Sequence, residues 1–193
     1  MTEQQPQTEP TQQRQFPDMW VDPDDDPRDT GVAPRGEKAV LAEYLDHFRM
    51  TFEMKCEGLD AEQLARRSVP PSSMSLLGLV RHLASVEFHW FRRFIEGHMD
   101  QPRPFKSPDD RDLDFNGAVA DPAVVAEAWE TWRGEVAHAR AVFETYDDLG
   151  TLVGPEGDQS ELREIVVHMV EEYARHCGHA DLLRECVDGR TGQ

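Results

Sequence analysis

The chain has 193 residues, which is enough for one domain with a hydrophobic core of ordinary size. Acidic residues outnumber basic ones by 38 to 20, and the resulting net charge of -18 repels nucleic acids and anionic lipid surfaces. No apolar run approaches the length of a membrane span, and the first residues, MTEQQPQTEP, lack the basic and apolar stretches of a secretion signal, so we expect neither a membrane nor a nucleic acid as partner.

The beginning of the chain is predicted to be a tail. Residues 1–36 are rich in Gln, Pro, Thr and Asp and offer almost nothing to bury. By composition we expect this tail to be acidic and disordered or loosely docked, ahead of a folded domain at residues 37–189. The triplet Met19-Trp20-Val21 could pack against that domain; an unstructured tail with a stray tryptophan is the alternative.

The next segments have the apolar spacing of amphipathic helices. From Glu37 to about Glu57, apolar side chains recur with a 3.6-residue period, and Gly58 is a natural stop. A short turn at residues 60–67 leads to a second helix at residues 76–96. A serine between Ser72 and Ser75 can cap the start of this helix, and Gly97 ends it. Because the connection between these two helices is short, we expect them to be antiparallel neighbours.

Two more helices are predicted beyond a long loop. Residues 98–120 carry several prolines and aspartates, and a loop of this length in a compact domain is usually functional or partly mobile. Asp121-Pro122 then starts a third helix that reaches about Tyr146, and after a glycine-rich loop a fourth helix spans residues 160–186. Four long helices without a convincing strand pattern predict an all-α four-helix bundle, in which the long loops allow a crossover.

The fourth helix carries the most informative pattern. Four polar residues recur at intervals of four, four and three and share one face of this helix: His168, Glu172, His176 and His179. The first and last are roughly 16 Å apart along the axis, so one ion can use only an adjacent pair, and three such pairs are available. Apolar residues on the same arc suggest that it faces the bundle interior, where a glutamate is costly unless it is protonated or ionised against a cation. This argument favours a pair that includes Glu172.

The helix at residues 76–96 can supply a third ligand. His82 lies at the edge of its apolar stripe, and His89 follows seven residues later on nearly the same face. Three protein ligands from two helices, with one position left open, are typical of a catalytic metal site. A single histidine on an apolar helix face is more often a hydrogen-bonded core residue, but the stacked polar groups on the fourth helix favour a metal.

These residues resemble a known family. The segments LLGLVRHLASVEFHWFRRFIEG and HMVEEYARHCGHADLLRE, with MWVDPDDDPR and GLDAEQL, resemble the DinB/YfiT-like superfamily of four-helix-bundle metal-binding proteins, in particular its actinobacterial branch related to mycothiol-dependent enzymes. The resemblance covers most of the domain. It implies a metal-binding histidine in an H-L-A context, which here is His82. It also implies two ligands four residues apart on the last helix.

The resemblance further implies which residues of the last helix bind the metal. His176-Cys177-Gly178-His179 is similar to the His-Arg-Gly-Gln motif of the family, which makes Glu172 and His176 the remaining ligands. His179 stands where the motif has glutamine, so the set of His82, His176 and His179 stays open as an alternative. A site with one glutamate suits Zn²⁺ best and is compatible with Ni²⁺, Mn²⁺ or Fe²⁺.

The resemblance implies two kinds of chemistry at this site. One is an S-transferase or isomerase reaction, in which the metal activates the thiolate of mycothiol or another low-molecular-weight thiol for attack on a small electrophile. The other is hydrolysis by metal-bound water. His89 and His179 are candidate catalytic acid–base groups. A non-catalytic bundle braced by the metal, an interaction module with an acidic tail, and a homodimer are further possibilities.

The cysteines predict where the protein is located. Cys56, Cys177 and Cys186 are an odd number without C-x-x-C spacing, so a disulfide scaffold is unexpected and a reducing cytoplasm is the simplest location. Cys177 points about 100° away from its neighbour His176 and is expected to be a packed thiol.

Overall fold

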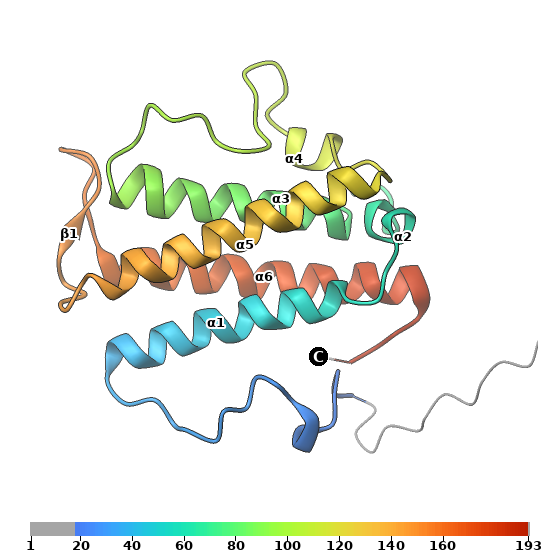
Figure 1. Cartoon of the computed structure of the whole chain (residues 1–193), viewed down its shortest axis with the longest axis horizontal. Coiled ribbons are helices and arrows are strands. Elements are labelled where there is room, and N and C mark those ends of the chain that lie inside the picture. The colour runs from blue at the N-terminus through green and yellow to red at the C-terminus, as the bar shows by residue number, and fades with distance from the viewer. Residues whose placement is uncertain (1–17, 193) are drawn as a thin grey trace, which may run out of the picture.

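The computed structural model describes residues 18–192 and confirms the expected all-α bundle (Figure 1). Its long helices are α1 (Glu37–Cys56), α3 (Leu76–Glu87), α5 (Pro122–Glu144) and α6 (Leu162–Asp188), and α3 continues without a break into the π-helical segment η2 (Phe88–Ile95). The short elements are η1 (Pro23–Asp25), α2 (Ala61–Ala65), α4 (Leu113–Asn116) and the two-residue strands β1 (Leu152–Val153) and β2 (Ser160–Glu161). None of the helices in residues 18–192 has the length and apolar character that crossing a bilayer requires.

Local sequence signals set the ends of these helices. The side chain of Ser75 accepts a hydrogen bond from the backbone of Gly78 and caps α3, and that of Asp121 caps α5, whose first residue is Pro122. Gly189 ends α6 in the left-handed conformation, with φ of 79°. The predicted helix ends at residues 96 and 146 therefore lie within two residues of the observed ones.

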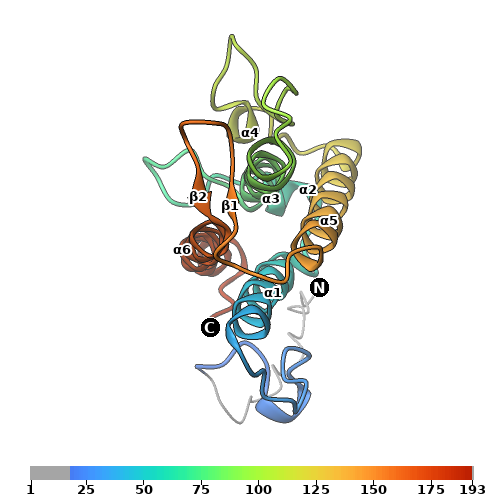
Figure 2. The ribbon, with the colours of Figure 1, turned by 90° about the vertical axis from the view of Figure 1, so that its left-hand side faces the viewer.

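The packing order of the helices differs from the expected one. In the view down the bundle, α1 packs beside α6 and α3 beside α5, so α1 and α3 occupy diagonal positions (Figure 2). The expectation that these two helices are neighbours was wrong. Their connection at residues 57–75 contains α2 and is long enough to reach the diagonal position.

The expected crossover is the segment between η2 and α5. It runs back along the length of the bundle, so that α3 and α5 point in the same direction and α6 runs antiparallel to both (Figure 1). An ion pair between Arg92 and Glu135 joins η2 to α5, and a hydrogen bond between His138 and Glu96 joins the end of η2 to the same helix. This crossover is not structureless, because it contains α4, which lies against α3.

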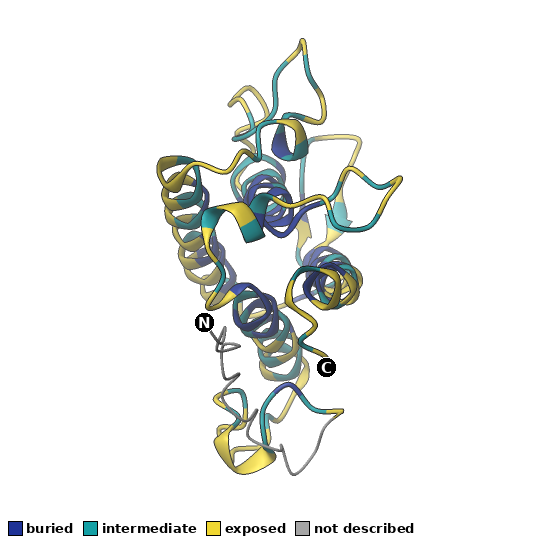
Figure 3. Ribbon diagram, turned by 90° about the vertical axis from the view of Figure 1, so that its right-hand side faces the viewer, coloured by how far each residue is buried: buried dark blue, intermediate teal, exposed yellow. Residues whose placement is uncertain are grey.

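The buried surfaces of the four long helices face one another (Figure 3). Among their apolar side chains lies a polar chain that links all four helices. Arg49 of α1 donates two hydrogen bonds to the carboxylate of Glu87 of α3, at 2.7 and 2.8 Å. The hydroxyl of Tyr173 in α6 donates to the same carboxylate at 2.8 Å and accepts a bond from the indole of Trp132 in α5 at 2.9 Å. All four side chains are buried.

The described part of the predicted tail, residues 18–36, is docked on the bundle through Trp20, which is 2% exposed. The amino group of Lys55 lies 4.1 Å from the centre of the indole ring, and the guanidinium group of Arg190 lies 3.7 Å from it. Such cation–π contacts add electrostatic attraction to the burial of the ring. Residues 1–17 lie outside the described residues, and the domain division at residue 36 stays a prediction.

Candidate metal centre

The centre begins with His82 in the middle of α3, where this helix faces α6. The Nδ1–H group of His82 donates to the buried carboxylate of Asp114 at 2.8 Å. This bond fixes the orientation of the ring and leaves Nε2 as its free coordinating atom. The side chain of His82 is 21% exposed, so the imidazole is reached from solvent.

Glu172 and His176 lie opposite His82 on successive turns of α6. Each of these three side chains offers one ligand atom, and the three atoms all lie within 4.8 Å of one another. Within α6, the Nε2 atom of His176 lies 3.3 Å from a carboxylate oxygen of Glu172. The structure therefore brings together the three residues that the sequence predicts as metal ligands.

The chemistry of these three groups fits a divalent cation. Two imidazole nitrogens and one carboxylate oxygen, contributed by two helices, form the donor set of a metal site with an open position. The hydrogen bond from His176 outweighs the effect of burial and lowers the pKa of Glu172 below its usual value, so the carboxylate is ionised at neutral pH. Glu172 is 26% exposed, which leaves the open side of the group facing solvent.

The other polar residues of the α6 arc lie beside the group and outside it. His179 Nδ1 lies 3.3 Å from His176 Nδ1, so one of the two rings donates to the other. His168 Nε2 lies 3.6 Å from Glu172, and its ring packs against Trp90 at 4.8 Å. Among the described residues, the group whose ligand atoms lie within 4.8 Å of one another contains Glu172 and not His179, and the choice between the two ligand pairs stays a prediction. The arc lies at the rim of the core and not in the interior as expected, because Glu172 and His168 are partly exposed.

Asp114 is the functional residue that the sequence analysis missed. It lies on α4 in the crossover, and besides accepting from His82 it forms an ion pair with Lys106 at 2.6 Å. Burial acts to raise the pKa of Asp114, but the bonds from His82 and Lys106 outweigh it and hold this pKa below its usual value. The position of the residue in an aspartate-rich loop gave no signal, because α4 meets α3 only in the folded chain.

A close approach of two helices holds Asp114 in place. A Cβ atom at Gly78 would lie 2.7 Å from the ring of Phe115, so glycine at this position lets α4 rest on α3. Phe115 then stacks on the imidazole of His82, with 5.4 Å between ring centres. Arg81 closes the contact from α3 by donating to two backbone carbonyl groups of α4.

His89, the second candidate catalytic residue, is not part of the three-residue group. Its ring packs against Trp90 at 5.1 Å, and its Nδ1 atom is buried without a hydrogen-bond partner among the described residues. Burial, followed by the charges of Arg103 and Arg93, lowers the pKa of His89 to about 4. His89 is therefore neutral at physiological pH.

The cysteines are free thiols, and two of them are buried. Burial raises the pKa of Cys177 to about 12 and that of Cys56 above its usual range, so neither is a thiolate at neutral pH. The thiol of Cys177 donates to the backbone carbonyl of Phe48, as expected for a packed residue. Cys186 is exposed, roughly 15 Å from His176 along the axis of α6.

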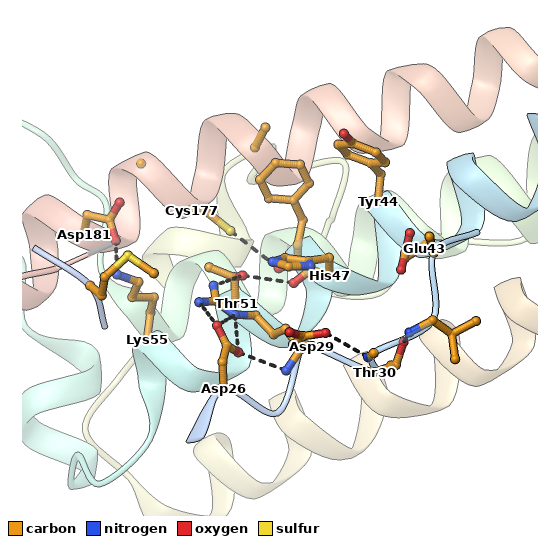
Figure 4. A pocket seen from close by; sticks show the side chains of 18 residues that line it. Asp26, Asp29, Thr30, Glu43, Tyr44, His47, Thr51, Lys55, Cys177 and Asp181 are labelled. Carbon is orange, nitrogen blue, oxygen red and sulfur yellow. Dashed lines mark hydrogen bonds and ion pairs between the residues drawn. The ribbon is translucent and has the colours of Figure 1, made fainter. Parts of the chain in front are cut away.

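A cavity of about 1010 Å³ lies apart from the candidate centre, between the N-terminal segment and helices α1 and α6 (Figure 4). Two ion pairs lie in its wall, because Lys55 contacts Asp181 at 2.6 Å and Arg28 contacts Asp26 at 2.7 Å. The α6 residues that line it face away from Glu172, because they follow it by two, five, six and nine positions. A molecule in this cavity would therefore lie behind α6, on the side opposite the candidate ligands.

Comparison with known proteins places this arrangement in a family. A family model described as mycothiol-S-transferase matches residues 40–189, a range that contains nearly all of α1 and the whole of α3, α5 and α6. The docked N-terminal segment lies outside the matched range. No curated protein matches the chain.

Proposed function

Since the chain belongs to the mycothiol-S-transferase family, we propose that it is a metal-dependent enzyme that joins the sulfur of mycothiol, or of a similar low-molecular-weight thiol, to a small electrophile. The observation that supports this most directly is the group of His82, Glu172 and His176, whose ligand atoms lie within 4.8 Å of one another at the solvent-facing rim of the bundle.

In this proposal His82, Glu172 and His176 hold one divalent cation. Zn²⁺ is the first candidate, because it takes imidazole nitrogen and carboxylate oxygen while leaving a coordination position open, and Ni²⁺, Mn²⁺ and Fe²⁺ are compatible with the same donors. When bound, the cation supplies a positive charge that keeps a thiol ionised at neutral pH.

The surrounding residues keep the two imidazoles in position. Asp114 accepts the Nδ1 proton of His82 and so holds the tautomer that has a free Nε2. His179 plays the corresponding part for His176 through the contact between their Nδ1 atoms. The ionised carboxylate of Glu172 contributes the single negative charge of the donor set.

The chemistry of the cysteines supports an external thiol. Cys56 and Cys177 are buried and protonated, and Cys186 is far from the candidate ligands. A nucleophilic sulfur at the centre therefore has to come from a small molecule. Three free thiols also suit a reducing compartment, so we propose that the enzyme works in the cytoplasm.

The reaction is tested with mycothiol and 1-chloro-2,4-dinitrobenzene, in which a carbon–sulfur bond forms, chloride leaves with the bonding electrons and the thiol proton passes to solvent. We expect zinc-loaded protein to accelerate this substitution, and His82→Ala to reduce the rate at least 100-fold. The matched control is His98→Ala, because His98 is exposed in the loop after η2.

Two results would contradict the proposal. One is the same rate for wild-type and His82→Ala protein. The other is turnover of esters or amides at a rate that does not depend on added thiol, which would assign the centre to hydrolysis.

A further inference from the structure

Two arginines near the candidate centre, Arg93 and Arg103, are held without an acidic partner in the described part of the chain. Among residues 18–192, Arg93 and Arg103 form no ion pair, whereas the adjacent Arg92 contacts Glu135 at 2.6 Å. Arg103 donates through Nε to the hydroxyl of Ser85 at 3.1 Å, and Arg93 donates to the backbone carbonyl of Met99 at 2.6 Å. Both guanidinium groups are therefore held by a hydroxyl or a carbonyl group and not by a carboxylate.

The contact with Ser85 places Arg103 close to His82. Ser85 is fully buried and follows His82 by three residues on α3, so the two side chains lie about one turn apart, roughly 4.5 Å along the axis. Arg103 comes from the crossover, the same segment that carries Asp114 to His82. Its two terminal nitrogens make no hydrogen bond to the described residues and remain available for a ligand.

Two buried polar atoms in the same region lack a hydrogen-bond partner among the described residues. Nδ1 of His89 and Nε of Arg93 are shielded from solvent and have no hydrogen-bond partner in the described part of the chain. A buried polar group without a partner costs free energy, so such atoms usually meet a ligand or an ordered water. The charges of Arg103 and Arg93 contribute, after burial, to the lowering of the pKa of His89, so both guanidinium groups lie near its imidazole.

We propose that Arg103 and Arg93 bind the carboxylate of the electrophile, so that the substrate of this transferase is a small organic acid. The two oxygens of a carboxylate match the paired N–H groups of a guanidinium. Trp90, which packs between His89 and His168, offers an apolar surface to the body of such a molecule. An electrophile anchored in this way presents its reactive carbon to the centre one turn away. The inference rests on the proposed transferase function for the reaction, while the carboxylate site itself can be tested without it.

The binding test uses 3-nitrobenzoate as an unreactive probe and nitrobenzene as its uncharged counterpart, titrated calorimetrically into zinc-loaded and chelator-treated protein. We expect 3-nitrobenzoate to bind both forms, and Arg103→Ala and Arg93→Ala to weaken it at least ten-fold. Arg111→Ala is the matched control, because Arg111 is an exposed arginine of the same crossover. Arg103→Gln, which keeps the hydrogen bond to Ser85 within reach, covers the case in which the alanine variant fails to fold.

Two outcomes of the titration would overturn the carboxylate site. One is equal binding of 3-nitrobenzoate and nitrobenzene. The other is binding of 3-nitrobenzoate only to zinc-loaded protein and to the same extent in the arginine variants, because the metal would then be the only anchor.

The kinetic test compares 4-chloro-3-nitrobenzoate with 1-chloro-2,4-dinitrobenzene at a fixed thiol concentration. We expect Arg103→Ala to raise KM for the carboxylated electrophile at least ten times more than KM for the uncharged one. In a second arm, 3-mercaptopropionate and 2-mercaptoethanol are compared as thiols. If Arg103→Ala raises KM for 3-mercaptopropionate but not for 2-mercaptoethanol, the arginines bind the carboxylate of the thiol and not that of the electrophile. That result would overturn the proposal.

The two tests separate the inference from the proposed function. If no thiol reacts with any electrophile but 3-nitrobenzoate binding depends on Arg103, the transferase function is wrong and the carboxylate site stands. If the transferase reaction proceeds without any preference for the carboxylated electrophile, the function stands and the inference is wrong.

Discussion

At the scale of single residues, the chemistry of the centre depends on how its imidazoles are held. Asp114 is fully buried, and its carboxylate receives both the Nδ1 proton of His82 and the ammonium group of Lys106. A neutral imidazole can present either nitrogen, and this bond selects Nε2 for the centre. A carboxylate that accepts a hydrogen bond from a metal-binding histidine fixes the orientation of the imidazole ring and raises the affinity of the site for the metal.

Asp114→Asn is expected to weaken zinc binding about 10- to 100-fold, because the amide is a poorer acceptor for His82 and leaves Lys106 without its counter-charge. The measurement is a competition titration against a chromophoric chelator. Asp109→Asn is the control, since Asp109 is exposed in the same loop. Equal affinities for the two variants would show that Asp114 does not position His82.

His89 gives the protein a defined pH dependence. Its pKa is about 4 in the folded chain and near 6.5 when unfolded, so between these values the unfolded state binds more protons and the free energy of unfolding falls as the pH falls. His89→Asn removes this titration. We expect the wild type to lose about 2–3 kcal/mol more than the variant between pH 7 and pH 4, measured by urea unfolding in the presence of chelator. Identical losses would contradict the lowered pKa.

The three candidate ligands could be predicted from the sequence, whereas Asp114 could not. Glu172 and His176 are one helical turn apart, so spacing alone places them together, and the resemblance to metal-binding bundles pointed to His82. A glutamate buried in the bundle does need a counter-charge, but the residue in that position is not Glu172. Among residues 18–192 the fully buried glutamate is Glu87, which pairs with Arg49, while Glu172 lies at the rim.

At the scale of the elements, the pair of Arg49 and Glu87 ties two diagonal helices together. Their closest contact is 2.7 Å, and both side chains are almost fully shielded from solvent. Helices in diagonal positions share few direct backbone contacts, so this pair and the hydroxyl of Tyr173 carry much of their connection. Removing one member of a buried pair leaves a charge without compensation.

Arg49→Met is expected to lower the free energy of unfolding by about 3–5 kcal/mol, because Glu87 stays buried without its counter-charge. Replacing both residues by methionine should recover most of the loss. Arg140→Met, which breaks the exposed pair with Asp46, serves as control and should cost less than about 1 kcal/mol. Urea unfolding measures all three, and a loss for Arg49→Met no larger than that of the control would contradict the account.

The N-terminal segment is held on the bundle by the buried ring of Trp20 and by the hydrogen bond from Arg28 to Thr51 of α1. In Trp20→Ala, residues 18–36 are expected to separate from α1 and α6 while the bundle stays folded, because the cation–π contacts with Lys55 and Arg190 are lost. Trypsin should then cleave after Arg28 at least ten times faster. Val32→Ala, a change at an exposed position of the same segment, is the control. Unchanged cleavage after Arg28 in Trp20→Ala would contradict this anchoring.

Local sequence signals predict the ends of the helices but not how the helices pack. Caps and glycines predicted the ends of the long helices, because these signals act within one turn. The diagonal placement of α1 and α3, the helix α4 and the π-helical winding of η2 were not predicted. They depend on contacts between segments distant in sequence, such as that of Phe115 with α3, which local spacing does not record.

At the scale of the whole molecule, the core and the candidate centre are separate. The apolar core and the polar chain from Arg49 to Trp132 involve all four long helices, whereas the candidate ligands join only α3 and α6 at the rim. The family match extends over all four helices, so the bundle and the centre belong to the shared part of the fold. A core formed without the candidate ligands suits a site whose role is chemical.

Removal of the metal is therefore expected to leave the bundle folded. Chelator-treated protein should keep its helical circular dichroism and lose only a few degrees in Tm, and added Zn²⁺ should restore the Tm in proportion to the logarithm of its free concentration. Thermal unfolding followed by circular dichroism checks this. Loss of the helical signal on chelation would instead favour a cation that braces the helices without catalysis.

The most direct test of the central claim is elemental analysis of the protein purified without a histidine tag. The account predicts about one divalent metal per chain in the wild type and in His98→Ala, and its loss in His82→Ala, Glu172→Ala and His176→Ala, with each variant still folded. A wild-type protein that takes up no metal, or variants that keep it, would contradict the claim that these three side chains form a metal centre.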